Sequence, residues 1–259
     1  MKSGAREFED RVALVTGATS GIGVACARAL AARGARLSLT GRSGERGAEV
    51  VEAIRGDGAE AVFRAGDVRD AGFCDRVVED TVAHFGRIDV LVNNAGIYIA
   101  GSTLETTDAE WDATLDTNLG AVFRLSRAAL RSMRAQGQGA IVNVASDWGL
   151  VGGERAVAYC ASKGGLVLLT RAMALDHARD GIRINAVCPT DTDTPMMRDD
   201  FRQRGLSLEQ GSRESAAGIP MGRMAEAGEV AEVVCFLASD AASFLTGVAL
   251  PVDGGTTAG

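Results

Sequence analysis

The sequence predicts an α/β protein with a doubly wound, mostly parallel sheet of seven strands and helices on both faces. Short apolar runs alternate with longer Ala-rich segments along the chain. Several of these runs are apolar nearly throughout, as in strands buried on both faces. A glycine cluster, "TGATSGIG", follows the first run. No linker or composition break divides the 259 residues, so we expect a single domain over 1–259.

The predicted strands, in chain order, are "RVALVT" (11–16), "ARLSLT" (35–40), "EAVFRA" (60–65), "IDVLVN" (88–93), "GAIVNVA" (139–145), "IRINAV" (182–187) and "GVALPV" (247–252). Between them, segments such as 23–34 and 71–86 repeat their apolar residues at helical spacing. The segment 190–225 differs because it is polar, irregular and long. Insertions of that kind often act as binding loops, so we expect a substrate-binding loop or lid there.

Composition excludes several classes of function. A net charge of −7 argues against a nucleic-acid surface and against attraction to anionic lipid. No run approaches the roughly 18 uninterrupted apolar residues that a membrane helix needs. We therefore expect a soluble, cytoplasmic protein.

Cysteines and histidines show no metal-binding pattern. The five cysteines are scattered, without a CxxC pair, which predicts reduced thiols rather than disulfides or a zinc site; they are Cys26, Cys74, Cys160, Cys188 and Cys235. His84 and His177 lie in helical segments without partners at ligand spacing. We expect structural roles for both histidines and no metal.

The glycine cluster at 16–23 predicts a dinucleotide site of the Rossmann type. Gly17, Gly21 and Gly23 let the chain turn tightly, approach a pyrophosphate and pack a helix against the strand. The helix that follows offers free N–H groups and a positive dipole end to phosphates. The alternative is a tight turn with a purely structural role.

The end of the second predicted strand favours NADP(H) over NAD(H). NAD-binding folds place an Asp or Glu there to bind the ribose hydroxyls, but this chain has Gly41, followed by Arg42. A guanidinium can bind a 2′-phosphate in a bidentate way. Against this, Arg42 is also explained as a solvated loop residue, and Ser20 stands where many NADP users carry a second basic side chain.

Three residues predict a catalytic group. Tyr159 and Lys163 are four residues apart and share one helix face, and Ser146 directly follows the predicted strand 139–145. A free Tyr has a pKa near 10, and we expect the Lys163 ammonium to lower the pKa of Tyr159 toward neutrality. Ser146 would hydrogen-bond a substrate carbonyl oxygen. The alternative is a surface Tyr–Lys pair with a helix-capping Ser.

With these motifs the sequence resembles the short-chain dehydrogenase/reductase family over nearly its whole length. The matching segments are "TGATSGIG" (16–23), "GDVRD" (66–70), "NNAG" (93–96), "TNLG" (117–120), Ser146, "YCASK" (159–163), "CPTDTDTP" (188–195) and "PVDGG" (251–255). The resemblance implies that Tyr159 is the acid in reduction and the base in oxidation. It also implies that Lys163 binds the nicotinamide ribose and that Asn118 helps to hold a water of the proton relay.

The resemblance and the glycine motif together give the expected cofactor contacts. They are Gly17, Ser20, Gly21, Ile22, Gly23, Arg42, Asp67, Val68, Asn94, Ala95, Gly96, Tyr159, Lys163, Pro189, Thr190, Thr192 and Thr194. One departure is that Thr190 follows Pro189 where the family usually has Gly. Its side chain would narrow the pocket or add a hydroxyl to it.

Substrate contacts are expected from Ser146, Asp147, Trp148, Thr190 and Met196. Asp147 would hydrogen-bond a substrate hydroxyl or amine and Trp148 would form an apolar wall; local capping and loop packing explain the two equally well. Met196 and three further methionines (Met197, Met221 and Met224) would line an apolar pocket. Core or oligomer packing is the alternative for them.

The leading hypothesis is an NADP(H)-dependent short-chain alcohol dehydrogenase or ketoreductase that interconverts a ketone and a secondary alcohol. The substrate candidates are 3-oxoacyl thioesters, sugars or polyols, steroids and secondary-metabolite ketones. The alternative is a non-catalytic nucleotide sensor or scaffold, which need not keep Asn118, Ser146, Tyr159 and Lys163 together. The resemblance also implies a homotetramer, with helices around 108–135 and 157–179 and the C-terminal strand region at subunit interfaces.

Overall fold

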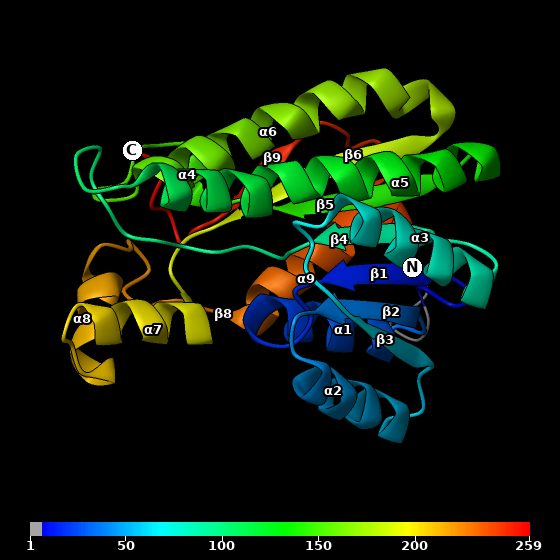
Figure 1. Ribbon diagram of the computed structural model, residues 1–259, viewed down its shortest axis with the longest axis horizontal. Helices are drawn as coiled ribbons and strands as arrows, with labels where there is room; N and C mark the ends of the chain where they lie inside the picture. Colours follow the sequence, from blue (N-terminus) through cyan, green and yellow to red (C-terminus); the bar gives the residue numbers. More distant parts are fainter. Residues whose placement is uncertain (1–6) are drawn as a thin grey trace.

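A seven-stranded parallel sheet forms the centre of the computed structural model, which describes residues 7–259 (Figure 1). The strand order is β3-β2-β1-β4-β5-β6-β9. The strands are β1 (Val12–Thr16), β2 (Arg36–Gly41), β3 (Ala61–Ala65), β4 (Val90–Asn93), β5 (Gly139–Val144), β6 (Ile182–Pro189) and β9 (Ala249–Val252). All seven predicted strands are confirmed, and each lies within two residues of its predicted ends.

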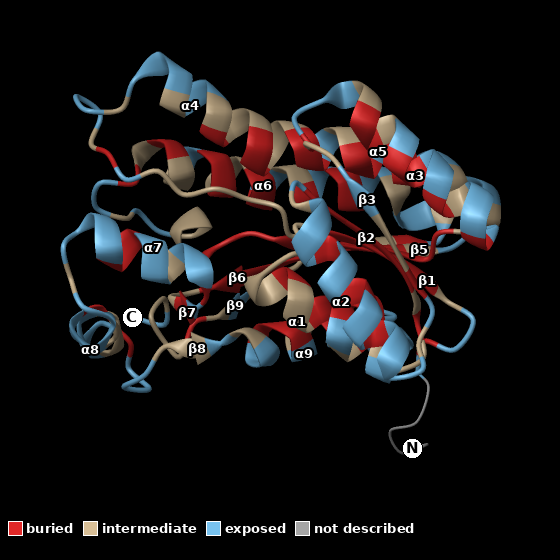
Figure 2. Ribbon diagram, turned by 60° about the horizontal axis from the view of Figure 1, so that its bottom comes forward, coloured by how far each residue is buried: buried red, intermediate tan, exposed pale blue. Residues whose placement is uncertain are grey.

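The central strands are apolar because both of their faces are covered. Every residue of β1 and β4 is buried. β1 pairs with β2 on one side, where Val12 faces Arg36, and with β4 on the other, where Leu14 faces Leu91. Figure 2 shows these strands as a buried layer between helices whose outer faces are exposed.

Two layers of helices enclose the sheet (Figure 1). One layer holds α3, α4, α5 and α6, and the other holds α1, α2 and α9. Their bounds are α1 Gly21–Ala32, α2 Gly44–Gly56, α3 Ala71–Phe85, α4 Asp108–Leu115, α5 Ala121–Gln136, α6 Val157–His177 and α9 Ala227–Ala238.

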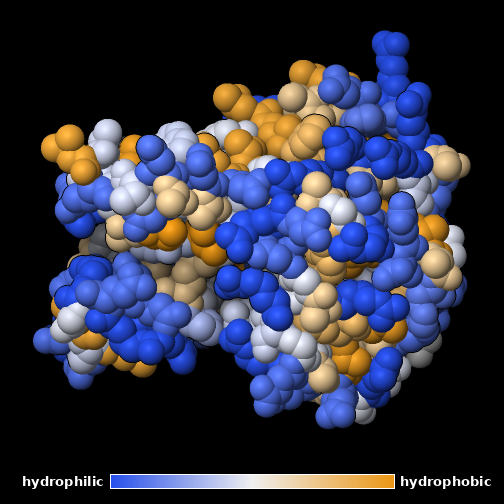
Figure 3. Space-filling view, in the orientation of Figure 1, coloured by the Kyte–Doolittle hydropathy of each residue, from blue (hydrophilic) through white to orange (hydrophobic). Residues whose placement is uncertain are grey.

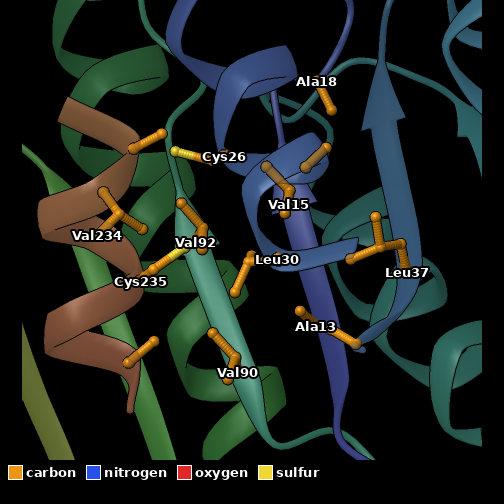
Figure 4. Close-up of a cluster of buried hydrophobic side chains, with 14 of the residues drawn as sticks. Ala13, Val15, Ala18, Cys26, Leu30, Leu37, Val90, Val92, Val234 and Cys235 are labelled. Carbon is orange, nitrogen blue, oxygen red and sulfur yellow. The ribbon is translucent and has the colours of Figure 1, made fainter. Parts of the chain in front are cut away.

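The core beneath α1 and α9 consists of apolar side chains, many of them small. Cys26 and Leu30 of α1 and Val234 of α9 are fully buried with Val92 of β4 in one cluster (Figure 4). All five cysteines are free thiols, as the sequence predicts. On the other face of the sheet, burial raises the pKa of the Cys74 thiol to about 11, and this side chain packs as a small apolar group in a cluster with Val77 and Leu91.

The strand order places a topological switch point between β1 and β4. From β1 the chain builds outward through β2 to β3, and it then returns to place β4 on the other side of β1. In open parallel sheets, ligands bind outside the carboxyl ends of the strands at such a point. Gly17, Asn94, Ser146 and Thr190 all lie just beyond a strand end on this edge.

The segment 190–225 is not irregular, and that prediction is wrong. It contains α7 (Pro195–Gln203), α8 (Leu208–Ala217) and a short parallel pair, β7 (Thr192–Asp193) with β8 (Ala225–Glu226). Side chains cap both helices: Thr194 accepts from the backbone N–H of Met197, and Ser207 forms a capping box with Gln210. The two helices bury few residues, and their sequences are correspondingly polar.

Both histidines form pairs with carboxylates away from the sheet edge. His84 Nε2 lies 3.6 Å from Glu60, and His177 Nδ1 lies 2.9 Å from Asp180. Within residues 7–259, no group of three or more His, Cys, Asp or Glu side chains is arranged to hold a metal ion. Over the same residues, no helix has the length and apolar character needed to cross a membrane.

Candidate active site

The glycine-rich loop after β1 packs flat against the loop after β4. Gly17 has a φ of +66°, and a Cβ placed on it would lie 2.8 Å from Asn94 Nδ2. A Cβ on Gly23 would lie 2.3 Å from the carbonyl oxygen of Gly17. Asn94 Nδ2 also donates to the Thr16 carbonyl at 2.9 Å. Only glycine fits at 17 and 23, so the backbone surface here is free of side chains, as a pyrophosphate requires.

The first turn of α1 is open to an anion. Ser20 is the N-cap residue but makes no side-chain capping bond, whereas α2, α3, α4, α7 and α8 are all capped by side chains. The half-buried Ile22 packs against the core and anchors this turn. Thr194 closes the far side, because a Cβ on Gly21 would lie 3.1 Å from its Cγ2. These features fit the pyrophosphate of a dinucleotide.

The end of β2 has no room for an acidic side chain in the present packing. Gly41 is buried, and a Cβ on it would lie 2.7 Å from Thr19 Cγ2. Arg42 is exposed next to it. Nearby, both Asp67 oxygens accept from the Arg69 guanidinium, and Arg69, with a smaller contribution from Arg42, holds the pKa of Asp67 below its usual range. Val68 is buried behind Asp67.

Two of the predicted residues, Asn118 and Lys163, lie beside a third, Gly96. A Cβ on Gly96 would lie 3.3 Å from Asn118 Oδ1 and 3.7 Å from Lys163 Nζ. Asn118 comes from a π-helical turn, Asp116–Gly120, between α4 and α5, and Lys163 comes from α6. π-turns inside helices frequently occur at functional sites. The fold therefore brings the "NNAG" loop, Asn118 and the helix of Tyr159 together.

The side chain of Asn118 is fully committed to protein groups. It is buried; its Oδ1 accepts from the Ile97 N–H at 2.8 Å, and its Nδ2 donates to the Ile97 carbonyl at 2.9 Å and to Ser162 Oγ at 3.1 Å. Asn118 thus ties the loop after β4 to α6. A water of the proton relay would therefore bind to the backbone of Asn118 rather than to its side chain.

Lys163 and Tyr159 lie one helical turn apart on α6. Lys163 is 4% exposed, donates to the Val144 carbonyl at 2.7 Å, and places Nζ 5.5 Å from the centre of the Tyr159 ring. Burial lowers the pKa of Lys163 to about 8. Burial also raises the pKa of Tyr159 above its ordinary value, opposed by a hydrogen bond to Ser146. The expectation that Lys163 lowers the pKa of Tyr159 is wrong for this structure, because desolvation dominates.

Ser146 and Asp147 form a buried pair after β5. Ser146 Oγ donates to Asp147 Oδ1 at 2.9 Å, and both residues are about 95% buried. The backbone N–H of Trp148 donates to the same Asp147 oxygen at 2.8 Å. Burial raises the pKa of the Asp147 carboxyl, and the Thr190 side chain lies close enough to that carboxyl to lower it by a smaller amount. Thr190, the departure from the family pattern, therefore supports Asp147.

Two aromatic rings, those of Tyr98 and Trp148, lie beside the ring of Tyr159. The Tyr98 ring lies 5.3 Å from the Tyr159 ring and 6.0 Å from the Trp148 ring, centre to centre, and Trp148 lies 6.2 Å from Tyr159. Sequence reasoning did not single out Tyr98, although it follows the "NNAG" segment by two residues. Figure 3 shows a hollow between the α4 and α7 sides of this end, with apolar surface along its upper edge.

The segment after β6 adds carboxylates to the same end. Asp191 hydrogen-bonds Ser215 of α8, and burial raises the pKa of Asp191. Asp191 and Asp200 both act to raise the pKa of Tyr98. Sequence reasoning missed Asp191, which lies inside the quoted "CPTDTDTP" segment. Met196 is 40% exposed on α7 and makes no described contact with this group.

The threonines of this segment are used within it. Pro189 ends β6, and the Thr190 N–H donates to the Val252 carbonyl at 3.3 Å. Thr192 Oγ1 donates to the Thr190 carbonyl at 2.8 Å, and Thr194 caps α7. Their hydroxyls shape the segment; Thr194 lies opposite Gly21, and Thr190 lies near Asp147.

Known proteins with similar sequences match nearly the whole length of this chain. The family model described as Enoyl-(Acyl carrier protein) reductase matches residues 17–257. The cis-4-hydroxycyclohexanecarboxylate dehydrogenase of Sinomonas cyclohexanicum is 44% identical over 97% of this chain and 98% of its own length. The meso-2,3-butanediol dehydrogenase of Serratia marcescens is 42% identical over 97% and 96%.

A solved structure shares the whole fold. The crystal structure of levodione reductase superposes with a TM-score of 0.92 at 40% identity and covers 97% of this chain and 99% of its own. Family model, relatives and fold all extend over nearly the full length. The chain belongs to the short-chain dehydrogenase/reductase family and is an oxidoreductase of alcohols and ketones.

Proposed function

We propose that this protein interconverts a small neutral ketone and its secondary alcohol with NADP(H), and that Tyr159 gives and takes the proton. The observation that carries the proposal is the convergence of Ser146, Tyr159 and Lys163 at the sheet edge next to the open first turn of α1. Such a group is the arrangement expected for proton transfer beside a bound dinucleotide.

Each residue has a distinct task in this proposal. The bound nicotinamide supplies or accepts the hydride. Tyr159 carries its proton at neutral pH, as a tyrosine with an ordinary pKa near 10 also does, and it gives this proton to the carbonyl oxygen in reduction. Ser146 orients that oxygen from the end of β5, and Lys163 fixes the geometry of α6 against β5 through the Val144 carbonyl. Oxidation requires the phenolate, which becomes more available as the pH rises.

The preference for NADP(H) rests on the end of β2. Thr19 occupies the space that an acidic side chain at position 41 would need. Arg42 is exposed there and near enough to Asp67 to affect its pKa. A guanidinium in that position suits a 2′-phosphate, to which it can donate two parallel hydrogen bonds.

The lining of the cleft supports a small neutral substrate. Tyr98 and Trp148 offer apolar faces beside Tyr159. Asp147 and Asp191 place negative charge behind them, which disfavours an anionic group next to the reacting carbon. The name of the Serratia marcescens relative denotes a small neutral diol, in line with this class, whereas that of the Sinomonas cyclohexanicum relative denotes a hydroxylated ring that carries a carboxylate. We further propose that the 190–225 segment is the lid over this cleft.

A homotetramer is proposed from the apolar surface of α5 and α6. Phe123 of α5 is 47% exposed, and Leu168 and Leu175 of α6 are 63% and 83% exposed. Phe244, shortly before β9, is fully exposed as well. Patches of this kind mark protein interfaces, and copies of the same chain are the partners that the family resemblance favours.

A cofactor-consumption screen tests the proposal. The purified protein is mixed with NADPH or NADH and small cyclic and acyclic ketones, and with NADP⁺ or NAD⁺ and the matching alcohols. We expect turnover of neutral ketones with NADPH preferred. A preference for NADH would contradict the role of Arg42, and no turnover with any pair, despite cofactor binding, would favour the non-catalytic alternative.

A further inference from the structure

The Ser146 hydroxyl points to the neighbouring carboxylate of Asp147. A serine hydroxyl has one proton to donate, and in this structure Ser146 Oγ donates it to Asp147 Oδ1 at 2.9 Å. In ketone reduction, the same proton is needed by the substrate oxygen as negative charge develops on it. An ionised carboxylate holds such a proton about twice as strongly as a neutral acceptor does.

The surroundings of Asp147 make its ionisation sensitive to pH. It is 5% exposed, and burial raises its pKa, while hydrogen bonds from Thr190, Ser146 and the Trp148 N–H act the other way. The titratable groups that face it are Tyr159 of α6, Cys188 of β6 and Asp191. None of these three brings a positive charge. The Lys163 ammonium, which also lies on α6, is directed at the Val144 carbonyl.

We propose that Asp147 is a positioning residue for ketone reduction, because its ionisation decides whether the Ser146 proton is held by Asp147 or is available to the substrate oxygen. The inference rests on the proposed function, in which Ser146 contacts that oxygen. With Asp147 protonated, its oxygen is a neutral acceptor and Ser146 turns its proton to the substrate. With Asp147 ionised, Ser146 presents lone pairs to a carbonyl oxygen, and reduction slows.

Thr190 affects the pH at which Asp147 ionises. A hydroxyl that donates to the carboxylate stabilises the ionised form, so Thr190 extends the pH range in which Asp147 is charged. The glycine usual in the family could not do so. The departure at 190 and the carboxylate at 147 are thus two parts of one arrangement.

The test is the pH profile of kcat/KM for NADPH-dependent ketone reduction. At pH values below the titration of Lys163, the wild type should lose activity as the pH rises through the raised pKa of Asp147. Asp147→Asn, neutral at every pH, should lack this limb and exceed the wild type by about tenfold at pH 7. Thr190→Val should move the limb to higher pH. Asp193→Asn is the matched control, since Asp193 is an exposed carboxylate paired with Arg198, and it should keep the limb.

A purely structural role for Asp147 predicts the opposite result. Asp147→Asn would then lose activity at every pH and keep the wild-type profile, and that outcome overturns the inference while the proposed function stands. Absence of turnover in the wild type would instead overturn the proposed function.

A second measurement does not depend on turnover. In protein with ¹³C-labelled aspartate carboxyls, the signal absent from Asp147→Asn identifies Asp147. Ser146→Ala removes a donor to this carboxylate, so the Asp147 titration should move to higher pH; an unmoved titration contradicts the link between the two residues.

Discussion

The Lys163 ammonium donates a 2.7 Å hydrogen bond to the backbone carbonyl of Val144, two residues before Ser146. This bond joins α6 to the end of β5, so the helix that carries Tyr159 and the strand that carries Ser146 are held in register by one buried charge. The pairing is with a neutral carbonyl rather than with a carboxylate. Burial therefore acts on the lysine almost without compensation, and lowers its pKa to about 8.

The titration of Lys163 can be followed directly. Lys2 and Lys163 are the only lysines of the sequence, so lysine labelled with ¹³C at Cε gives two side-chain signals. One should titrate near pH 8, and Lys163→Met should remove it. Two signals that both titrate above pH 10 would contradict the burial of a charged Lys163.

The lowered pKa of Lys163 also makes the stability of the protein depend on pH. Between pH 8 and 10.5 the unfolded chain keeps a proton on this lysine that the folded chain has lost, so the free energy of unfolding rises with pH. The rise attributable to Lys163 is at most about 3 kcal/mol. Urea unfolding at pH 7.5, 9 and 10 should show it in the wild type relative to Lys163→Met, whereas parallel curves would contradict it.

Removal of the Arg42 guanidinium should weaken NADPH binding. Loss of a charge-assisted bidentate contact corresponds to a rise of about tenfold or more in KM for NADPH. KM for NADH should change little, and Arg46→Ala on the neighbouring α2 serves as the matched control. Equal effects of Arg42→Ala on both cofactors would remove the basis for the NADP(H) preference.

The packing of Gly41 predicts how the preference could be reversed. Gly41→Asp alone should destabilise the loop, because the new Cβ would lie 2.7 Å from Thr19 Cγ2. The double variant Gly41→Asp with Thr19→Ala should fold and prefer NADH. Thr19→Ala alone is the control and should keep the wild-type preference; a double variant that still prefers NADPH would show that position 41 does not select the cofactor.

Much of this account could be predicted from the sequence, for identifiable reasons. The strands were found within two residues because helices cover both faces of the sheet and leave unbroken apolar runs. The glycines at 17 and 23 were found because only glycine fits where two backbones touch. The helices α7 and α8 were missed because they bury little: Asp200 and Phe201 in one, Gly211 in the other.

The chemistry of the site was less predictable. Spacing along one helix correctly puts Lys163 near Tyr159, but the sign of the Tyr159 pKa shift depends on burial by segments far apart in the chain. Tyr98 and Asp191 were missed for the same reason, since each reaches the site only through the tertiary fold. The link between Thr190 and Asp147 joins residues 43 positions apart and follows from no local pattern.

The buried carboxyl of Asp191 should make the protein less stable as the pH rises above 4. Its folded pKa is raised, so in that range the folded chain binds the proton that the unfolded chain has lost. Asp191→Asn should therefore gain stability relative to the wild type at pH 7, and the gain should vanish near pH 3.5. Asp193→Asn, at an exposed carboxylate paired with Arg198, should change stability by less than about 1 kcal/mol. Thermal unfolding at pH 7 and pH 3.5 measures this difference. An Asp191→Asn variant that is no more stable than the wild type at pH 7 would contradict the prediction.

A charge in the apolar surface of α5 should disrupt the proposed tetramer. Phe123→Glu places a carboxylate where a second copy would pack, and light scattering should report a smaller assembly. Leu208→Glu, at an exposed residue of α8, is the control and should leave the mass unchanged. A wild-type monomer, or an unchanged Phe123→Glu assembly, would contradict the placement of the interface.

The central claim is that Tyr159 transfers the proton. Tyr159→Phe keeps the ring and its contacts with Tyr98 and Trp148 but removes the hydroxyl. The decisive measurement is the kcat of this variant for ketone reduction, taken alongside its Kd for NADPH. We expect kcat to fall by about a thousandfold or more while Kd stays within about threefold of the wild type. A Tyr159→Phe enzyme that retains wild-type turnover would contradict the account.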